Sequence, residues 1–207
     1  MKKLGCLILL ILLILLILWW LRGRPDDPDP SECVGVQTYT RNPALFIEEA
    51  LPPGPGTAQP VTDTMVISDT GTIVDLNVGV TVHLPEHGEL IFDLESPSGT
   101  TVRFLSTEGG PGDGLENVSF DDEASGPPPS FVVNGTCLVN QSYQPGPDSF
   151  SDFDGETING TWTLTVADAF VGDASDCDCD GFVVGPDCPR TLDEWSLTID
   201  CGSEQAR

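Results

Sequence analysis

Hydrophobic side chains recur at every second position through much of the chain beyond residue 60. Because successive side chains of a β-strand point to opposite faces of its sheet, this spacing predicts strands with one buried face. The hydrophobic members of the five runs are Val74, Leu76, Val78, Val80 and Val82; Leu90, Phe92 and Leu94; Val102 and Phe104; Trp162, Leu164 and Val166; and Trp195, Leu197 and Ile199. Both tryptophans of this set are therefore expected in the core.

Short segments rich in glycine, proline, aspartate and serine separate these runs. They are Asp69–Gly71, Ser96–Gly99, Gly109–Gly112 and Pro127–Pro129. Such residues favour turns, and no segment after the N-terminus has the period of an amphipathic helix. Many short strands joined by turns predict an all-β sandwich or barrel.

The N-terminus has a different pattern, an unbroken hydrophobic run from Leu4 to Leu21. As a helix this run is about 27 Å long, close to the roughly 30 Å hydrocarbon core of a bilayer. Lys2 and Lys3 precede it, as in a signal sequence, but the run is long and lacks a small-residue cleavage site. We predict that residues 1–24 are a transmembrane signal anchor, with a cleaved signal peptide as the alternative.

This N-terminus predicts an exported protein whose domain lies on the extracytoplasmic side, in the periplasm or outside the cell. It is membrane-anchored through residues 4–21, or secreted if the N-terminus is cleaved. We expect residues 25–60, which are rich in proline and glycine, to form a stalk, of which Cys33 to Glu49 can lie against the domain. Residues 61–207 are expected to form the folded domain, with a Cys/Asp-rich insertion near 172–190.

The exported part is strongly acidic. From residue 25 onward it has 33 acidic residues against four arginines, a formal charge of −29. Such a surface repels nucleic acid, which excludes a nucleic-acid partner, and it attracts cations, calcium above all.

Six cysteines lie in the exported part: Cys33, Cys137, Cys177, Cys179, Cys188 and Cys201. An even number in a chain with an export signal predicts up to three disulfides. Six cysteines permit 15 pairings, and the sequence does not choose among them. The pairing that we favour is Cys33 with Cys201, because it would close the domain near its two ends.

Five motifs, in order, resemble the P domain (P/Homo B domain) that follows subtilisin-like proprotein convertases. They are Gly88–Thr100 (GELIFDLESPSGT), Gly109–Asp113 with Phe120–Ala124, Phe153–Gly155, Asn159–Asp168 and Leu192–Ile199. The family motif has Gly-Asp-Leu where this chain has Gly88-Glu89-Leu90, and often Asn where it has Gly114. The insertion near 172–190 has no counterpart in that pattern.

This resemblance covers about residues 61–200 and implies a jelly-roll-like β-sandwich of about eight strands. In that family the P domain accompanies a separate catalytic domain and helps it to fold and remain stable. The resemblance therefore implies a partner protease and no catalytic residues in this chain, which we expect not to be an enzyme.

The insertion contains the spacing of a calcium-binding loop. Its candidate ligands are Asp176, Asp178, Asp180, the backbone carbonyl of Phe182, and Asp187. Aspartate at the last position is shorter than the usual glutamate, which predicts weak binding. The alternatives are a chance match in an acidic chain and a disulfide-bonded hairpin with solvated acids.

Two further groups are candidate metal ligands. The family resemblance places six acids in loops that can lie together: Asp113, Asp121, Asp122, Glu123, Asp152 and Asp154. The segment His83–His87 matches the H-x-x-E-H pattern of zinc proteases. That chemistry requires both histidines on one helical face, whereas here strands are predicted on both sides, so we expect a solvated turn.

These observations predict a non-catalytic, membrane-tethered module that binds or stabilises another exported protein, either a separate protease or another surface protein. The alternative is a structural surface protein that binds calcium. A third, less favoured hypothesis is a protease-linked hydrolase in its own right, for which Glu86 is the residue to test.

Overall fold

The computed structural model describes residues 13–14, 31–48, 50, 59–84, 87–106, 114–126, 137–169 and 190–202. The chain divides into two compact units, Met1–Glu32 and Cys33–Arg207. In the first unit, Leu13 and Ile14 are helical and exposed. Among the described residues no helix is long and apolar enough to cross a membrane. The expected anchor at 4–21 lies almost entirely outside these residues and stays a prediction.

The second unit is built from strands. In the described residues of this unit, eight strands have six residues or more and three have two residues. They are β1 (Val36–Arg41), β2 (Leu45–Phe46), β3 (Val61–Ile67), β4 (Asp75–His83), β5 (Leu90–Glu95), β6 (Thr101–Ser106), β7 (Leu115–Phe120), β8 (Leu138–Val139), β9 (Ser142–Tyr143), β10 (Gly160–Asp168) and β11 (Thr191–Asp200). Two 3-10 turns, η1 (His87–Glu89) and η3 (Phe150–Phe153), join them.

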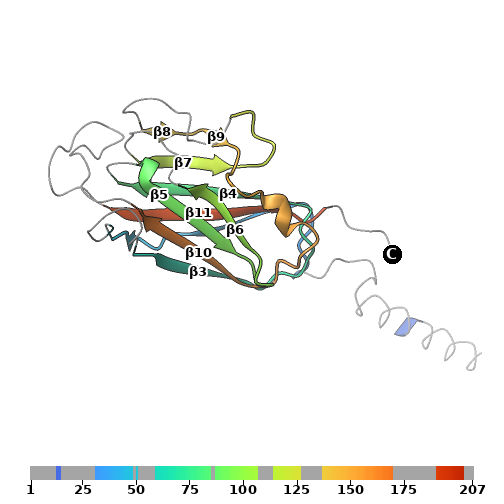
Figure 1. The fold of residues 1–207 in the computed structure, drawn as a ribbon. Helices are drawn as coiled ribbons and strands as arrows, with labels where there is room; N and C mark the ends of the chain where they lie inside the picture. The colour runs from blue at the N-terminus through green and yellow to red at the C-terminus, as the bar shows by residue number, and fades with distance from the viewer. Residues whose placement is uncertain are drawn as a thin grey trace, which may run out of the picture. The chain divides into compact units, whose positions relative to one another are not determined.

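The strands form two sheets packed face to face (Figure 1). One sheet has the order β1-β11-β4-β7-β8, and the other has the order β3-β10-β5-β6. The eight long strands pair antiparallel, and only the short β8 and β9 run parallel to β7. When the eight long strands are numbered 1 to 8 along the chain, the order in one sheet is 1-8-3-6. The order in the other sheet is 2-7-4-5. This is the strand order of a jelly roll, so the expected fold is confirmed.

The core lies between the sheets and follows the alternation of the sequence. β4 alternates half-buried and buried residues along its whole length, and Trp162 and Trp195 are fully buried, as predicted. A chain of aromatic contacts runs from Phe92 through Phe104 to Phe120 and Phe150.

The expected boundary between stalk and domain must be corrected, and the segment Cys33 to Glu49 lies against the domain as the sequence allowed. β1 and β2 lie within residues 25–60, and both pair with β11 in the larger sheet. The compact unit accordingly begins at Cys33 rather than at residue 61. β1 has no buried hydrophobic face, because five of its six residues are exposed at the sheet edge. Its sequence, VQTYTR, therefore lacks the alternation by which the other strands were recognised.

The sandwich has two ends with different chemistry. The disulfide end contains Cys33, the start of β4, the end of β7, η3 and the end of β11. At the other, distal end lie Val61, Leu84, Leu115, Ala169 and Arg190, all at or near the boundaries of the described segments. β10 ends and β11 begins at the distal end, and residues 172–189 of the predicted insertion lie outside the described residues.

Candidate functional site

Acidic side chains gather at the disulfide end. Asp121, Asp122 and Glu123 follow β7, Asp154 follows η3, and Asp75 begins β4. Asp122 holds this arrangement together, because its carboxylate accepts the backbone N–H of Phe150 (3.1 Å) and of Ser151 (2.8 Å). Asp121 accepts the N–H of Glu123 at 2.8 Å. The loop after β7 is thereby fixed to the start of η3.

The electrostatics of this acidic end show mutual repulsion. Burial, followed by the charges of Asp121, Asp154 and Asp122, raises the pKa of Asp75. Burial and the charge of Asp122 raise the pKa of Asp154. A hydrogen bond with Asp121, ahead of desolvation and the charge of Asp75, raises the pKa of Glu123. The structure thus brings Asp121, Asp122, Glu123 and Asp154 together as predicted and adds Asp75.

These acids influence one another through charge without converging on one point. In the described part of the chain, no three or more acidic, histidine or cysteine side chains are placed to hold a metal ion. Asp152 is exposed on η3, and Asp113 lies outside the described residues. The calcium-loop candidates Asp176, Asp178, Asp180, Phe182 and Asp187 also lie outside them. Calcium binding by either group stays a prediction.

A second charged group is buried at the distal end. Asp168 is only 1% exposed, and its Oδ2 lies 3.4 Å from Nη1 of Arg190, whose side chain is 12% exposed. Asp168 continues the inward series of Trp162, Leu164 and Val166 on β10, so it points between the sheets. The signal for this buried charge in the sequence is an acid at an inward position of that alternation.

A second ion pair joins the edges of the two sheets. The guanidinium of Arg41 on β1 donates two hydrogen bonds to Asp63 on β3, at 3.0 and 3.1 Å. The indole N–H of Trp195 donates to the same carboxylate at 2.8 Å. Burial acts to raise the pKa of Asp63, but the hydrogen bonds from Arg41 and Trp195 outweigh it, so the pKa lies below its usual value. The ionised carboxylate of Asp63 therefore connects β1, β3 and β11.

The three arginines of the described domain are all paired with carboxylates. Arg41 pairs with Asp63, Arg103 with Asp93, and Arg190 with Asp168. The Arg103 pair lines a shallow depression together with Thr101, Pro147 and Asp148. Positive charge in this part of the chain is thus neutralised locally, and the acidic side chains determine the charge that a partner meets.

The described residues of the H-x-x-E-H segment are not helical in the way that a zinc protease requires. His83 ends β4, and its Nδ1 hydrogen-bonds the carboxylate of Asp193 at 2.8 Å. His87 begins the three-residue turn η1, and residues 85 and 86 lie outside the description. A strand residue and a turn residue do not share a helical face, which agrees with the expected turn.

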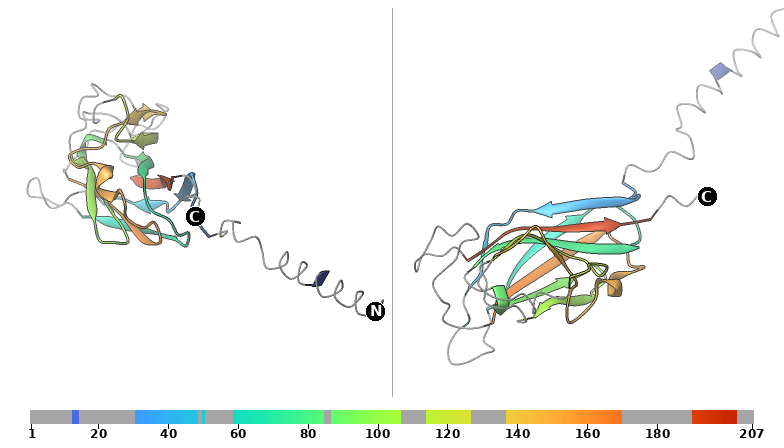
Figure 2. Two further views of the ribbon diagram at one scale, coloured as in Figure 1. Left: turned by 90° about the vertical axis from the view of Figure 1, so that its right-hand side faces the viewer. Right: turned by 90° about the horizontal axis from the view of Figure 1, so that it is seen from above.

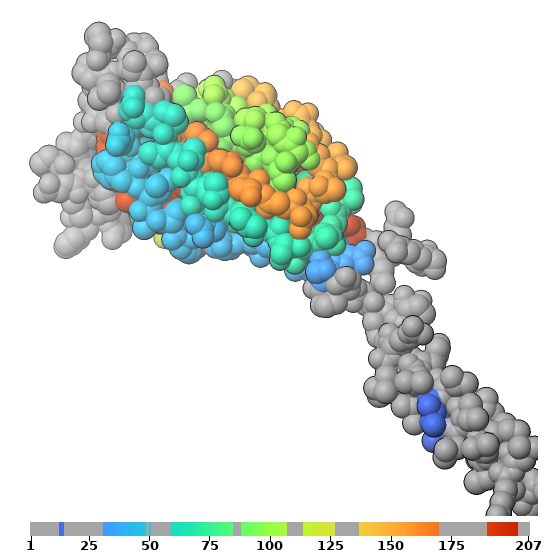
Figure 3. Space-filling view, turned by 90° about the horizontal axis from the view of Figure 1, so that it is seen from below, coloured from blue at the N-terminus to red at the C-terminus, as the bar shows by residue number. Residues whose placement is uncertain are grey.

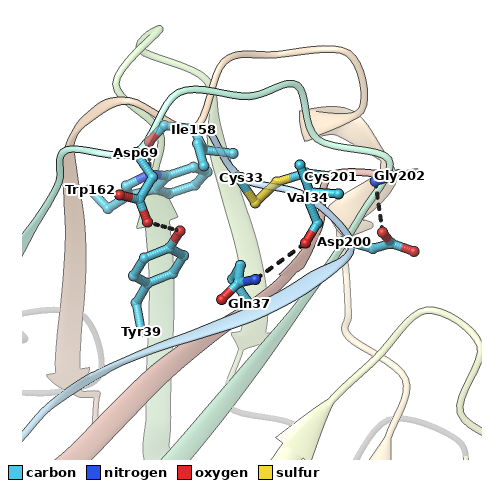
Figure 4. The surroundings of a disulfide bond; sticks show 10 residues. All are labelled: Cys33, Val34, Gln37, Tyr39, Asp69, Ile158, Trp162, Asp200, Cys201 and Gly202. Atoms are coloured by element: carbon cyan, nitrogen blue, oxygen red, sulfur yellow. Dashed lines mark hydrogen bonds between the residues drawn. A yellow bond between two sulfur atoms is a disulfide. The ribbon is translucent and has the colours of Figure 1, made fainter. Parts of the chain in front are cut away.

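Cys33 and Cys201 form a disulfide, as favoured from the sequence (Figure 4). It joins residues 168 positions apart and lies where β1 begins and β11 ends. Close by, the hydroxyl of Tyr39 donates to Asp69 at 2.8 Å, and burial, ahead of this bond, raises the pKa of Tyr39. Cys137 is also disulfide-bonded. The other candidates, Cys177, Cys179 and Cys188, lie outside the described residues.

Comparisons with known proteins give two kinds of match. Among solved structures, the serine protease of Aeromonas sobria is 18% identical, with a TM-score of 0.47, covering 88% of this chain and 29% of that chain. The complex of that serine protease with the chaperone ORF2 gives 19% identity, a TM-score of 0.47, and coverage of 89% and 29%. The chain thus spans less than a third of those chains. The comparison with curated proteins gave no match.

The second kind of match is a family model. The model of the proprotein convertase P-domain matches residues 73–199, which run from the residues before β4 almost to the end of β11. The match covers more than half of the chain, and β1, β2 and β3 precede it. Together with the jelly-roll strand order, it establishes that the chain belongs to the proprotein convertase P-domain family.

Proposed function

We propose that this protein is a non-catalytic, membrane-tethered module on the extracytoplasmic side that binds and stabilises a separate exported protease. The observation that carries the proposal is membership of the P-domain family, whose members are accessory domains of proteases. The hydrophobic run at 4–21 supports tethering, and the Cys33–Cys201 disulfide supports an oxidising compartment. The protein acts on its partner by contact and performs no hydrolysis itself.

The test is the thermal inactivation of a partner. A subtilisin-like serine protease that lacks a P domain is produced with and without the full-length protein in the same membrane. We expect a longer half-life of the protease at elevated temperature when the protein is present. A Trp195→Ala variant, whose core is disrupted, is the control for a folded domain. The proposal would be contradicted if the half-life stayed unchanged for every such protease of the organism that makes this protein.

The alternative function is that of a calcium-binding structural surface protein. The spacing of Asp176, Asp178, Asp180, Phe182 and Asp187 favours it, and so does the acidic surface. Thermal unfolding of the full chain is compared in excess calcium and in chelator. A ligand at 100 times its dissociation constant adds about 2.7 kcal/mol, which is a shift of several degrees.

The control for that experiment is the double substitution Asp178→Asn with Asp180→Asn. If these residues bind calcium, the calcium-dependent shift disappears in the variant, while its melting temperature in chelator stays near that of the wild type. The absence of a shift in the wild type would exclude the calcium function and leave the protein-binding function standing.

A further inference from the structure

Among the described residues, none pairs with the outer edge of β1, whose backbone hydrogen-bonding groups are free there. β1 pairs with β11 in continuous register from Val36↔Asp200 to Arg41↔Trp195. Gly35, just before β1, directs its N–H at Gly202 and its C=O at Cys201, so both groups face the strand beside it. Backbone direction alternates in an antiparallel pair, and the N–H and C=O groups of Val36, Thr38 and Thr40 therefore point away from β11.

The other edges are occupied or protected. β3 carries Asp63 at an inward position, and an inward charge on an edge strand opposes pairing with another strand. The edge of β6 is covered, because Gly146 and Asp148 donate their N–H groups to Phe104 and Arg103. β8 and β9 have only two residues each. Strand β1 has none of these devices between Val36 and Thr40: no proline, lysine, bulge or inward charge.

The side chains of β1 are uncharged from Val36 to Thr40, and Arg41 at its distal end is neutralised by Asp63. The acidic side chains near the two ends of β1 belong to β11. Thr38 bonds Thr198 through their hydroxyl groups at 3.1 Å, and Thr40 lies opposite Ser196. Asp200 lies opposite Val36 at the disulfide end, and Glu194 accepts a hydrogen bond from Asn42 beyond the distal end of β1. Figure 2 shows β1 as the outermost strand of its sheet, and in Figure 3 its segment borders the smaller sheet.

We propose that the free edge of β1 is a strand-addition site for an extended segment of a partner protein with basic residues at its two ends. Main-chain hydrogen bonds to Val36, Thr38 and Thr40 supply the affinity, and the carboxylates of Asp200 and Glu194 on β11, beside the two ends of β1, select the charge. A second copy of this chain is the disfavoured occupant, because it has the same acidic surface and a net charge of −25.

β1 precedes residues 73–199, so the site lies outside the segment matched by the P-domain model. The proposal deepens the function proposed above, on which it rests for the identity of the partner. Its test uses no protease, so that failure of one proposal is distinguishable from failure of the other.

The probe is a fluorescent synthetic peptide, acetyl-Arg-Val-Thr-Val-Thr-Arg-amide, added to the full chain in mild detergent. A peptide with glutamate in place of both arginines is the control for charge. We expect saturable binding of the basic peptide by fluorescence anisotropy and slower hydrogen exchange at the amides of Val36, Thr38 and Thr40. The acidic peptide is expected to bind at least about tenfold more weakly.

Two substitutions at one position separate backbone pairing from side-chain effects. Thr38→Pro removes an outward N–H without taking a hydrogen bond from β11, and we expect it to weaken peptide binding at least about tenfold. Thr38→Val also loses the hydroxyl bond to Thr198 but keeps the N–H, and it is expected to bind like the wild type. Circular dichroism establishes that both variants fold.

Three results would overturn the proposal. The first is binding to Thr38→Pro as strong as to the wild type, and the second is unchanged exchange at the three amides when peptide is bound. The third is a concentration-dependent dimer of the wild type that Thr38→Pro abolishes, which would assign the edge to a second copy. If Thr38→Pro fails to fold, amide exchange in the wild type decides.

Discussion

At the scale of single residues, burial decides which of the ion pairs matter. Asp168 and Arg190 are nearly enclosed at the distal end, whereas the side chains of Arg103 and Asp93 are 43% and 24% exposed. Water screens the second pair, and such pairs contribute about 1 kcal/mol or less to stability. Removal of one member of a buried pair leaves an uncompensated charge in the interior.

Replacement of Asp168 by alanine is therefore expected to lower the free energy of unfolding by about 3–5 kcal/mol. The double variant Asp168→Leu with Arg190→Leu removes both charges and is expected to recover most of that loss. Urea unfolding monitored by tryptophan fluorescence measures both. Arg103→Ala, at the exposed pair, is the matched control, with an expected loss of about 1 kcal/mol or less. Equal losses at both sites would show that burial of the Asp168 pair is unimportant.

At the scale of elements, β1 depends on a covalent bond as well as on its pairing with β11. It is an edge strand with little buried surface, and the Cys33–Cys201 disulfide joins its beginning to the end of β11. Since the disulfide closes a loop that contains nearly the whole domain, it removes many conformations from the unfolded chain. The same bond keeps the beginning of β1 beside the end of β11.

Replacement of Cys33 and Cys201 together by serine is expected to destabilise the domain by about 5 kcal/mol in the chain-entropy description. Because β1 has few other contacts, hydrogen exchange in β1 is expected to rise more than in β4, which lies inside the sheet. Urea unfolding and amide exchange measure the two effects. A uniform rise in exchange over β1 and β4 would contradict a local role of the disulfide.

At the scale of the whole molecule, the acidic surface opposes folding near neutral pH. The carboxyl groups of Asp75 and Asp154 have raised pKa values in the folded state, chiefly from burial and then from neighbouring carboxylates. A raised pKa means that the folded protein holds the proton more tightly than the unfolded chain does. These groups therefore contribute stability below their ordinary pKa, and that contribution is lost as the pH rises through the folded pKa.

Asp75→Asn is accordingly expected to raise the melting temperature at pH 7 in the presence of chelator, because it removes a charge repelled by Asp121, Asp154 and Asp122. The gain is expected to shrink with added salt and to vanish below about pH 4, where the wild-type carboxyl is protonated as well. Scanning calorimetry across this range measures it, with the exposed Asp152→Asn as control. A lower melting temperature at pH 7 would mean that the carboxylate of Asp75 stabilises the fold.

The pattern of the sequence predicted an all-β sandwich or barrel and most of the inner strands, and the family resemblance implied the jelly roll. Alternation marks a strand wherever one of its faces is buried, as in β4, β5, β10 and β11, and the same rule placed Trp162 and Trp195 in the core. Cysteine positions near the two ends of the domain favoured the disulfide that is observed.

Only the tertiary structure decided which segments without a local pattern belong to the sandwich and which distant charges meet. β1 is held by hydrogen bonds to β11 and by a disulfide, neither of which requires hydrophobic residues at alternate positions. The pairs Arg41–Asp63 and Asp168–Arg190 and the acidic end arise from strands and loops brought together by the sheet order. Charges of this kind act through space, and their meeting depends on topology, which no local period in a sequence encodes.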